Sequence, residues 1–162
     1  MDLQAAVLTA SDRCSRGAPD LSGALLVRQL SELGFQLAEH AVVPDDKLAI
    51  VKKLVHWSDD LNVNLIVTTG GTGASPRDVT PEATRMAIDR PFPGLCEAMR
   101  AESTKHTPFG LLSRSEAGSR GRTLILNFPG NPKAIEELWP VVAPVLVHAC
   151  RLLAGQDDPH TH

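Results

Sequence analysis

The stretch that decides the fold is Leu65–Gly73, which reads LIVTTGGTG. Its first three residues form a short, continuously apolar run, which is typical of a strand buried on both faces of a parallel sheet. The run passes through two threonines into Gly70, Gly71 and Gly73, and a glycine cluster of this kind ends a strand in a loop. The stretch therefore predicts a buried strand followed directly by a glycine-rich loop.

Alternating strand and helix patterns precede this stretch. Ala5–Ala10 and Leu37–Val43 both read as strands, because apolar residues dominate short runs bounded by turn residues. Between them, leucines recur at helical spacing, with Asp20 or Ser22 as the N-cap and Gly34 at the end of the helix. The order strand, helix, strand is typical of an α/β domain.

A second helix is expected before the decisive stretch. It begins at Asp45 and Asp46, whose carboxylates are favourable at a helix N-terminus. Two roles are therefore open to Asp45, a helix cap and a metal ligand, and the local sequence alone favours the cap.

Helix and strand patterns also follow the glycine loop. Thr80 and Pro81 form an N-cap and first-turn pair for a helix through Glu82–Asp89, and another helix is expected after Pro93. Thr123–Phe128 then reads as a further strand, because it is another compact apolar run. The alternation of strands with helices therefore continues beyond the loop.

The last segment begins with the turn Pro129–Pro132, which supplies a cap and a new helix start. Pro140 and Pro144 each remove a backbone donor, so we expect a short helix to about Trp139 and a separate final helix carrying Val145–Leu153. Together these patterns predict a three-layer α/β fold, a mostly parallel sheet with helices on both faces. Ligands of such folds bind at the carboxyl ends of the strands.

Length and composition limit the classes of protein that fit. A chain of 162 residues is sized for a single domain, which we place at residues 1–155, with 156–162 as a flexible tail. The net charge of -3 and the absence of tyrosine argue against nucleic-acid binding. No apolar run reaches the roughly 18 residues of a membrane span and no signal-peptide pattern is present, so we expect a cytoplasmic protein without a membrane partner. Three widely spaced cysteines fit reduced thiols.

The glycine loop has the composition of a phosphate site. Missing side chains let backbone N–H groups approach an anion, and the threonines add hydroxyl donors. It is not a Walker loop, and Pro76 stands where the dinucleotide fingerprint has its third glycine. A tight structural turn is the alternative. Arg77 and Asp78 follow at once, and a guanidinium clamp beside a potential Mg²⁺ ligand favours phosphate chemistry.

Five motifs, taken in order, resemble those of the Mog/gephyrin G-domain family of molybdopterin adenylyltransferases. The resemblance extends over nearly the whole chain, to about Gly155. The motifs are SDR at Ser11–Arg13, VPDD at Val43–Asp46, TTGGTGASPRDVTPEAT at Thr68–Thr84, LSR at Leu112–Arg114 and NFPGNPKA at Asn127–Ala134.

The resemblance implies a molybdopterin-binding fold, usually trimeric, with ATP and molybdopterin as substrates and Mg²⁺ as cofactor. AMP passes from Mg·ATP to the terminal phosphate of molybdopterin, and pyrophosphate is released. Asp45 and Asp78 match the family's functional aspartates, and we assign them to Mg²⁺ and to orienting the transfer. A molybdenum-inserting protein is then expected to act downstream.

The remaining ligand contacts are carried over in the same way. The glycine loop would touch both substrates, through Thr69, Gly70, Gly71, Thr72 and Gly73. The nucleotide side would take in Ser11, Asp12, Gly130, Asn131 and Lys133. The pterin side would take in Ser113, Arg114 and Asn127. Each of these residues also has a structural alternative, as a cap, a strand-end hydrogen-bonder or a surface charge.

Three functions remain open at this point. The first is the adenylyltransferase, favoured by Asn127 within LILNFPG, which is more like Mog than like the related MoaB branch. The second is a MoaB-like molybdopterin-binding or carrier protein that does not turn over ATP. The third is an unrelated nucleotide-dependent phosphotransferase that has converged on a glycine loop, whose ATP turnover would be indifferent to pterin.

Overall fold

The structure is a computed structural model that describes residues 2–156 of the chain. The predicted tail lies outside the described residues except for Gln156. Within the described part, no helix combines the length and apolar character needed to cross a membrane.

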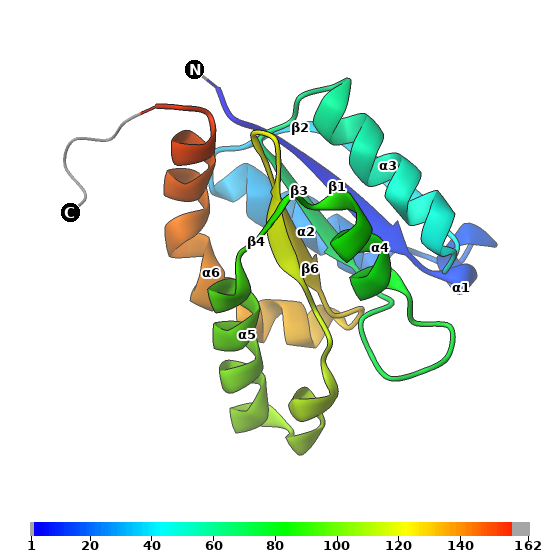
Figure 1. The fold of residues 1–162 in the computed structure, drawn as a ribbon. Helices are drawn as coiled ribbons and strands as arrows, with labels where there is room; N and C mark the ends of the chain where they lie inside the picture. The colour runs from blue at the N-terminus through cyan, green and yellow to red at the C-terminus, as the bar shows by residue number, and fades with distance from the viewer. Residues whose placement is uncertain (1, 157–162) are drawn as a thin grey trace.

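One sheet forms the middle layer of the described chain, and its six strands are ordered β2-β1-β3-β6-β5-β4 (Figure 1). β2, β1, β3 and β6 are parallel, whereas β5 and β4 are antiparallel to their neighbours. The bounds are β1 Gln4–Ala10, β2 Gln36–Val43, β3 Leu65–Thr69, β4 Arg90–Pro91, β5 Ala117–Arg120 and β6 Thr123–Phe128. The predicted three-layer, mostly parallel α/β fold is confirmed.

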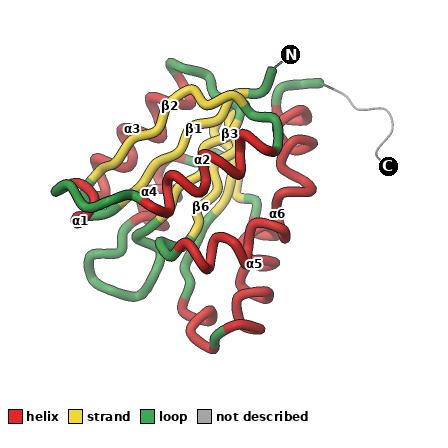
Figure 2. Tube along the Cα trace, turned by 180° about the vertical axis from the view of Figure 1, so that it is seen from behind, coloured by secondary structure: helices red, strands yellow, loops and turns green. Residues whose placement is uncertain are grey.

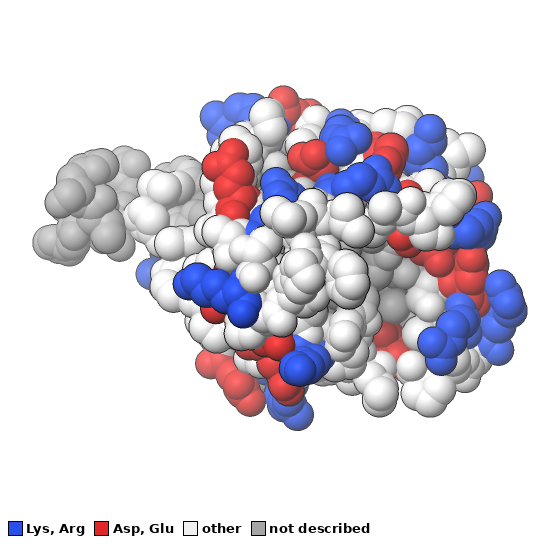
Figure 3. All heavy atoms as spheres, turned by 90° about the horizontal axis from the view of Figure 1, so that it is seen from below, with Lys and Arg blue, Asp and Glu red and all other residues white. Residues whose placement is uncertain are grey.

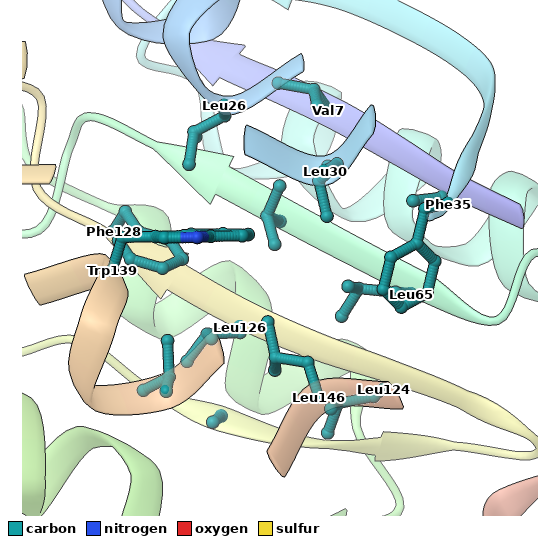
Figure 4. Packing of buried hydrophobic residues seen from close by; sticks show 14 of the residues in the cluster. Val7, Leu26, Leu30, Phe35, Leu65, Leu124, Leu126, Phe128, Trp139 and Leu146 are labelled. Atoms are coloured by element: carbon teal, nitrogen blue, oxygen red, sulfur yellow. The ribbon is translucent and has the colours of Figure 1, made fainter. Parts of the chain in front are cut away.

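Helices cover both faces of the sheet, as Figures 1 and 2 show from opposite sides. One face packs against α2 (Leu21–Glu32), α5 (Pro93–His106) and α6 (Pro132–Leu153), and the other against α3 (Lys47–Asp59) and α4 (Thr80–Ala87). The alternation of side chains along each strand explains the two layers. Leu65 and Val67 of β3 join the first cluster, drawn in Figure 4, while Ile66 joins the second.

The predicted strands Ala5–Ala10, Leu37–Val43 and Thr123–Phe128 are confirmed within a residue, as is the strand that starts at Leu65. The antiparallel strands β4 and β5 were not predicted. β5 reads AGSR and β4 reads RP, so neither has the apolar run that marks the central strands. The pairing of β5 with β6 and of β4 with β5 is decided by tertiary contacts.

The prediction of two C-terminal helices is wrong, because α6 is a single helix of 22 residues that contains Pro140 and Pro144. The two prolines are four residues apart and both exposed, so the carbonyl groups that they leave without a partner face water. The opposite side packs Val142 and Leu146 against the sheet. That packing holds one helix together, and it bends along its length (Figure 1).

The start of α4 also differs from the prediction. Thr80 is not the N-cap but the first helical residue; Val79 is the cap and accepts no side-chain hydrogen bond there. The Thr80 hydroxyl instead donates to the carbonyl oxygen of Gly70 over 2.9 Å. α4 is thereby tied to the glycine loop.

Candidate functional site

The site lies where the chain leaves the carboxyl ends of β1, β3 and β6. β1 continues into α1 (Asp12–Ser15), β3 into the glycine loop, and β6 into the turn before α6. β2 and β3 lie on opposite sides of β1, so the strand order reverses direction between β1 and β3. A topological switch point of this kind opens a crevice at the carboxyl ends of the strands, where α/β folds bind ligands.

The first turn of the loop needs glycine. Gly70 and Gly71 have φ values of 92° and 69°, a region that disfavours residues with a Cβ. A Cβ on Gly70 would stand 2.3 Å from the carbonyl oxygen of Ala10, and one on Gly71 would stand 2.4 Å from the Thr80 hydroxyl. The glycines therefore let the loop cross the end of β1 while the backbone stays accessible to a ligand.

Two cavities in the described part of the chain flank this loop. The apolar cavity has a volume of about 510 Å³ and is walled by Met99, Phe109, Leu112 and Leu138 along with polar residues. The acidic cavity has a volume of about 380 Å³ and contains Asp20, Asp45 and Arg13 in its walls. Both volumes suit small ligands. Figure 3 views the molecule from below, where a hollow lies beside an uncharged centre that acidic and basic side chains surround.

Three residues line both cavities: Gly71, Asp78 and Gly130. The cavities are therefore neighbours separated by the glycine loop and by the turn after β6. Asp78 is the ionisable residue of this shared wall. Two ligands, one in each cavity, would face each other across it.

The acidic side of the site is built on a reciprocal contact between Asp12 and Asp45. The backbone N–H of Asp12 donates to Asp45 Oδ2 over 3.1 Å, and that of Asp45 donates to Asp12 Oδ1 over 3.0 Å. Arg77 then donates to both oxygens of Asp12 over 2.9–3.1 Å. The loop after the glycines is thereby joined to the loops after β1 and β2.

The pKa values of these two aspartates are shifted in opposite directions. The Arg77 guanidinium lowers the pKa of the Asp12 carboxyl below its ordinary value. Burial raises the pKa of Asp45, and the nearby carboxylates of Asp12 and Asp78 raise it further. A cation beside Asp45 would relieve both the burial and the repulsion.

The donor set fits Mg²⁺ that arrives with a phosphate ligand. Asp45 and Asp78 both line the acidic cavity, and Asp78 Oδ2 also accepts the backbone N–H of Ser75 over 3.0 Å. The described residues contain no group of three or more His, Cys, Asp or Glu side chains placed to hold a metal. Mg²⁺ is commonly held by one or two carboxylates with water and substrate phosphates, and this site offers that arrangement.

The capping role considered for Asp45 is wrong. Asp46 is the N-cap of α3, and its Oδ1 accepts the backbone N–H of Ala49 over 2.8 Å. Asp45 precedes the cap and is turned toward Asp12. The structure thus separates the two neighbouring aspartates, one holding the helix and one reaching the cavity.

Many of the predicted ligand residues do line a cavity. Gly71 and Gly130 line both. Ser11, Thr69 and Gly70 line the acidic cavity, and Thr72, Gly73 and Ser113 line the apolar cavity. The Thr69 hydroxyl is not a free donor, because it donates to the Pro129 carbonyl over 2.8 Å.

Arg114 hydrogen-bonds to the backbone of the glycine loop and of the segment after it, and it does not line either cavity of the described chain. Its guanidinium donates to the carbonyl oxygens of Gly73 and Asp78, each over 2.8 Å, and forms an ion pair with Glu82. These bonds fix both ends of the Gly73–Asp78 segment, while the ligand contact of Arg114 stays a prediction.

Asn127 is fully buried and lies outside the two cavity walls that the structure describes. Its amide donates to the Thr68 and Thr84 hydroxyls over 2.9 and 3.0 Å and accepts the backbone N–H of Glu116 over 3.0 Å. These bonds join β3, α4 and β6. The structure therefore gives Asn127 a role in holding these elements together, while its pterin contact stays a prediction.

Three more predicted residues stand beside the cavities and are not among the described lining residues: Asp12, Asn131 and Lys133. The carboxylate of Asp12 forms an ion pair with Arg77. Asn131 is the N-cap of α6, as the turn predicted, and accepts the backbone N–H of Lys133 over 2.9 Å. Asn131 and Lys133 are both exposed, and Pro132 between them lines the acidic cavity.

The sequence did not reveal several residues of the cavity walls. Asp20 was identified only as a cap, which it is, and it also lines the acidic cavity. Arg100 and Ser103 of α5 and Phe109 of the following 3-10 helix η1 (Pro108–Leu112) line the apolar cavity. Only the packing of α5 on the sheet turns these residues toward the loop, and the sequence carries no local signal of it.

Comparison with known proteins gives a consistent result. Residues 6–148 match the family described as "Probable molybdopterin binding domain". The molybdopterin adenylyltransferase of Helicobacter pylori strain J99 is 42% identical over 152 residues, which cover 92% of this chain and 86% of that protein.

Two solved structures are similar over nearly their whole length. The molybdopterin biosynthesis enzyme MoaB of Thermus thermophilus has a TM-score of 0.88 at 45% identity, covering 94% of this chain and 97% of that one. The molybdopterin biosynthesis protein Mog of Mycobacterium ulcerans has a TM-score of 0.89 at 36% identity, covering 96% and 99%. The chain therefore belongs to the molybdopterin-binding family that includes Mog, MoaB and the G domain of gephyrin.

Proposed function

We propose that this protein is a molybdopterin adenylyltransferase of molybdenum cofactor biosynthesis. The observation that carries the proposal is the pair of cavities that share Gly71, Asp78 and Gly130 as a common wall. A transferase must hold two substrates with their reacting groups in contact, and two adjoining cavities provide that proximity. The name of the Helicobacter pylori relative supports the same reaction.

We assign the nucleotide to the acidic cavity and the pterin to the apolar cavity. A terminal phosphate oxygen of molybdopterin would attack the α-phosphorus of ATP and form a new phosphoanhydride bond. The bond between the α- and β-phosphates would break, and its electron pair would leave with pyrophosphate. The backbone N–H of Gly71 is suited to hold these phosphates, whereas that of Gly70 donates to the Phe128 carbonyl over 3.2 Å.

Asp45 and Asp78 would hold Mg²⁺, which supplies positive charge to the triphosphate and to the departing pyrophosphate when it is bound. The chain's own residues then act by position. Arg114 fixes the segment that carries Asp78, and the reciprocal pair with Asp12 fixes Asp45. Arg13, in the wall of the acidic cavity, adds a guanidinium for phosphate oxygens.

The resemblance to the family adds further predictions about the setting of the enzyme. We propose that residues 1–155 work as a single domain within a homotrimer in the cytoplasm. The adenylylated product would pass to a molybdenum-inserting protein.

The proposal is tested by measuring pyrophosphate release by the purified chain with Mg·ATP under anaerobic conditions, with and without molybdopterin. We expect release only when molybdopterin is present, together with an adenylylated product. Release that is indifferent to the pterin would instead identify a nucleotide-dependent phosphotransferase and contradict the proposal.

A molybdopterin-binding protein without ATP turnover is the second candidate. The similarity to Thermus thermophilus MoaB, at 45% identity, is the reason to consider it. Tight binding of molybdopterin without release of pyrophosphate would support this second function.

A further inference from the structure

Phe109 stands at the apolar cavity with most of its ring in water. Its residue is 74% exposed, yet it lines the cavity together with Leu112. Deeper in the same wall, Met99 and Leu138 are each only 3% exposed. The cavity thus has a buried apolar floor and an exposed aromatic residue at its rim, which gives a planar ligand a contact that it would otherwise lack.

The backbone of η1 keeps Phe109 in this position. Gly110 packs so closely on α5 that a Cβ there would stand 2.5 Å from the Ser103 hydroxyl. The Thr107 hydroxyl at the start of η1 accepts the backbone N–H of Phe109 over 3.3 Å. The ring is therefore presented by a segment that is held against the cavity wall.

Polar groups beside the ring select a heterocycle over a purely apolar ligand. Arg100 uses one guanidinium nitrogen to donate to the Ser115 carbonyl over 3.0 Å, and the rest of its donors are available to a ligand. Ser103 and Ser113 add hydroxyl groups in the same wall. A fused ring with donors and acceptors along its edge matches this combination of an apolar face and polar side chains.

We propose that Phe109 is the substrate-contacting residue that stacks on the pterin ring and sets the affinity of the apolar cavity for molybdopterin. The inference rests on the proposed function, because that function supplies the pterin. Stacking on an aromatic side chain contributes to binding whether or not the phosphates react. Phe109 therefore affects KM for molybdopterin and not the chemical step.

Leu111 provides a matched control. It lies on the same 3-10 helix and is 75% exposed, almost the same as Phe109, but it is not among the described residues of the cavity wall. Both residues can be replaced by alanine with a similar change in exposed apolar surface. Any effect that belongs to the surface of η1 in general would appear in both variants.

The test compares Phe109→Ala, Phe109→Tyr and Leu111→Ala with the wild type in pyrophosphate release. We expect Phe109→Ala to raise KM for molybdopterin about tenfold or more, as loss of one aromatic stacking contact would. Its kcat and its KM for ATP should stay within about twofold of wild type. Leu111→Ala should behave as wild type, because Leu111 is not among the described residues of the cavity wall. Phe109→Tyr should have a lower KM for molybdopterin than Phe109→Ala, because it keeps an aromatic ring.

A second measurement separates this inference from the proposed function. Binding of 6-hydroxymethylpterin, followed by its fluorescence, should weaken about tenfold in Phe109→Ala even if the wild type releases no pyrophosphate. Equal effects of Phe109→Ala and Leu111→Ala on pterin binding would overturn the inference. A rise in KM for ATP instead of molybdopterin would overturn it as well, since the cavity would then hold the nucleotide.

Discussion

Asp12 and Asp45 each accept the backbone N–H of the other, over 3.0 and 3.1 Å. The contact ties the loop after β1 to the loop after β2. Arg77 forms an ion pair with Asp12, whereas Asp45 is the member of the pair that lines the acidic cavity. The catalytic proposal for Asp45 depends on this division.

Asp45→Asn should lower pyrophosphate release about a hundredfold, because a bound Mg²⁺ contributes several kcal/mol of charge stabilisation. Asp46→Asn is the control: asparagine caps a helix as well as aspartate does, so activity should be retained. Equal activity of the two variants would contradict the assignment.

The Asp45→Asn variant should not lose thermal stability. Burial and neighbouring carboxylates raise the pKa of Asp45, so the folded chain binds its proton more tightly than the unfolded chain does. The ionised carboxylate therefore opposes folding at neutral pH, and this penalty decreases as the pH falls toward the raised pKa. We expect the Tm of Asp45→Asn at pH 7 to equal or exceed that of the wild type in a calorimetric scan.

Pyrophosphate release should require a divalent cation. EDTA should abolish it and excess Mg²⁺ should restore it, since Asp45 and Asp78 present carboxylates to the same cavity. Asp78→Asn should need a higher Mg²⁺ concentration for half-maximal rate than the wild type. Full activity in EDTA would exclude this role for both aspartates.

The central part of the fold could be predicted from the sequence because it depends on local patterns. β3 is a compact apolar run and Asp20 caps α2 in the predicted manner. β5 could not be predicted, because AGSR becomes a strand only through its pairing with β6. α6 stays continuous across two prolines because its buried side chains pack on the sheet, which local propensity does not report.

Only part of the candidate site could likewise be predicted from the sequence. The glycine loop and Asp78 follow a recognisable strand, so their place at its carboxyl end could be foreseen. Arg114 and Asn127 are polar residues in motifs of the same family, yet one braces the loop and the other is buried beneath it. A motif indicates that a polar residue is important, whereas its burial and its hydrogen-bond partners decide whether it contacts the ligand.

Arg114→Lys should weaken the brace on the glycine loop. Arg114 contacts Gly73, Asp78 and Glu82 together, and a lysine ammonium cannot reproduce this planar set of contacts. We expect kcat/KM to fall about tenfold and the Tm to drop. Arg85→Lys, which alters a largely exposed pair with Glu116, should change neither by much. Similar losses in both variants would show that Arg114 has no special role.

Asn127→Ala should destabilise the fold by about 2–4 kcal/mol, because it leaves the buried Thr68 hydroxyl and the Glu116 N–H without their partner and removes one of the two hydrogen bonds of Thr84. Asn131→Ala removes only an exposed helix cap, for which the loss is about 1 kcal/mol. Urea unfolding measures both. If Asn127→Ala is as stable as the wild type and has a raised KM for molybdopterin, Asn127 contacts the pterin as the sequence predicts.

The three cysteines allow the nucleotide cavity to be located without turnover. Cys14 is partly exposed and lines the acidic cavity. Burial raises the pKa of both Cys96 and Cys150 to about 12, so at pH 8 roughly one in ten thousand of these thiols is ionised. Iodoacetamide should therefore modify Cys14 first in the folded protein, and all three cysteines after unfolding.

Saturating Mg·ATP should slow the alkylation of Cys14 about tenfold, because nucleotide in the acidic cavity would cover the thiol. Saturating 6-hydroxymethylpterin should leave the rate unchanged, because the apolar cavity does not include Cys14 among its described lining residues. Mass spectrometry of tryptic peptides follows each cysteine separately. Protection by the pterin and not by Mg·ATP would reverse the assignment of substrates to cavities, while the shared wall at Asp78 would still place their phosphates side by side.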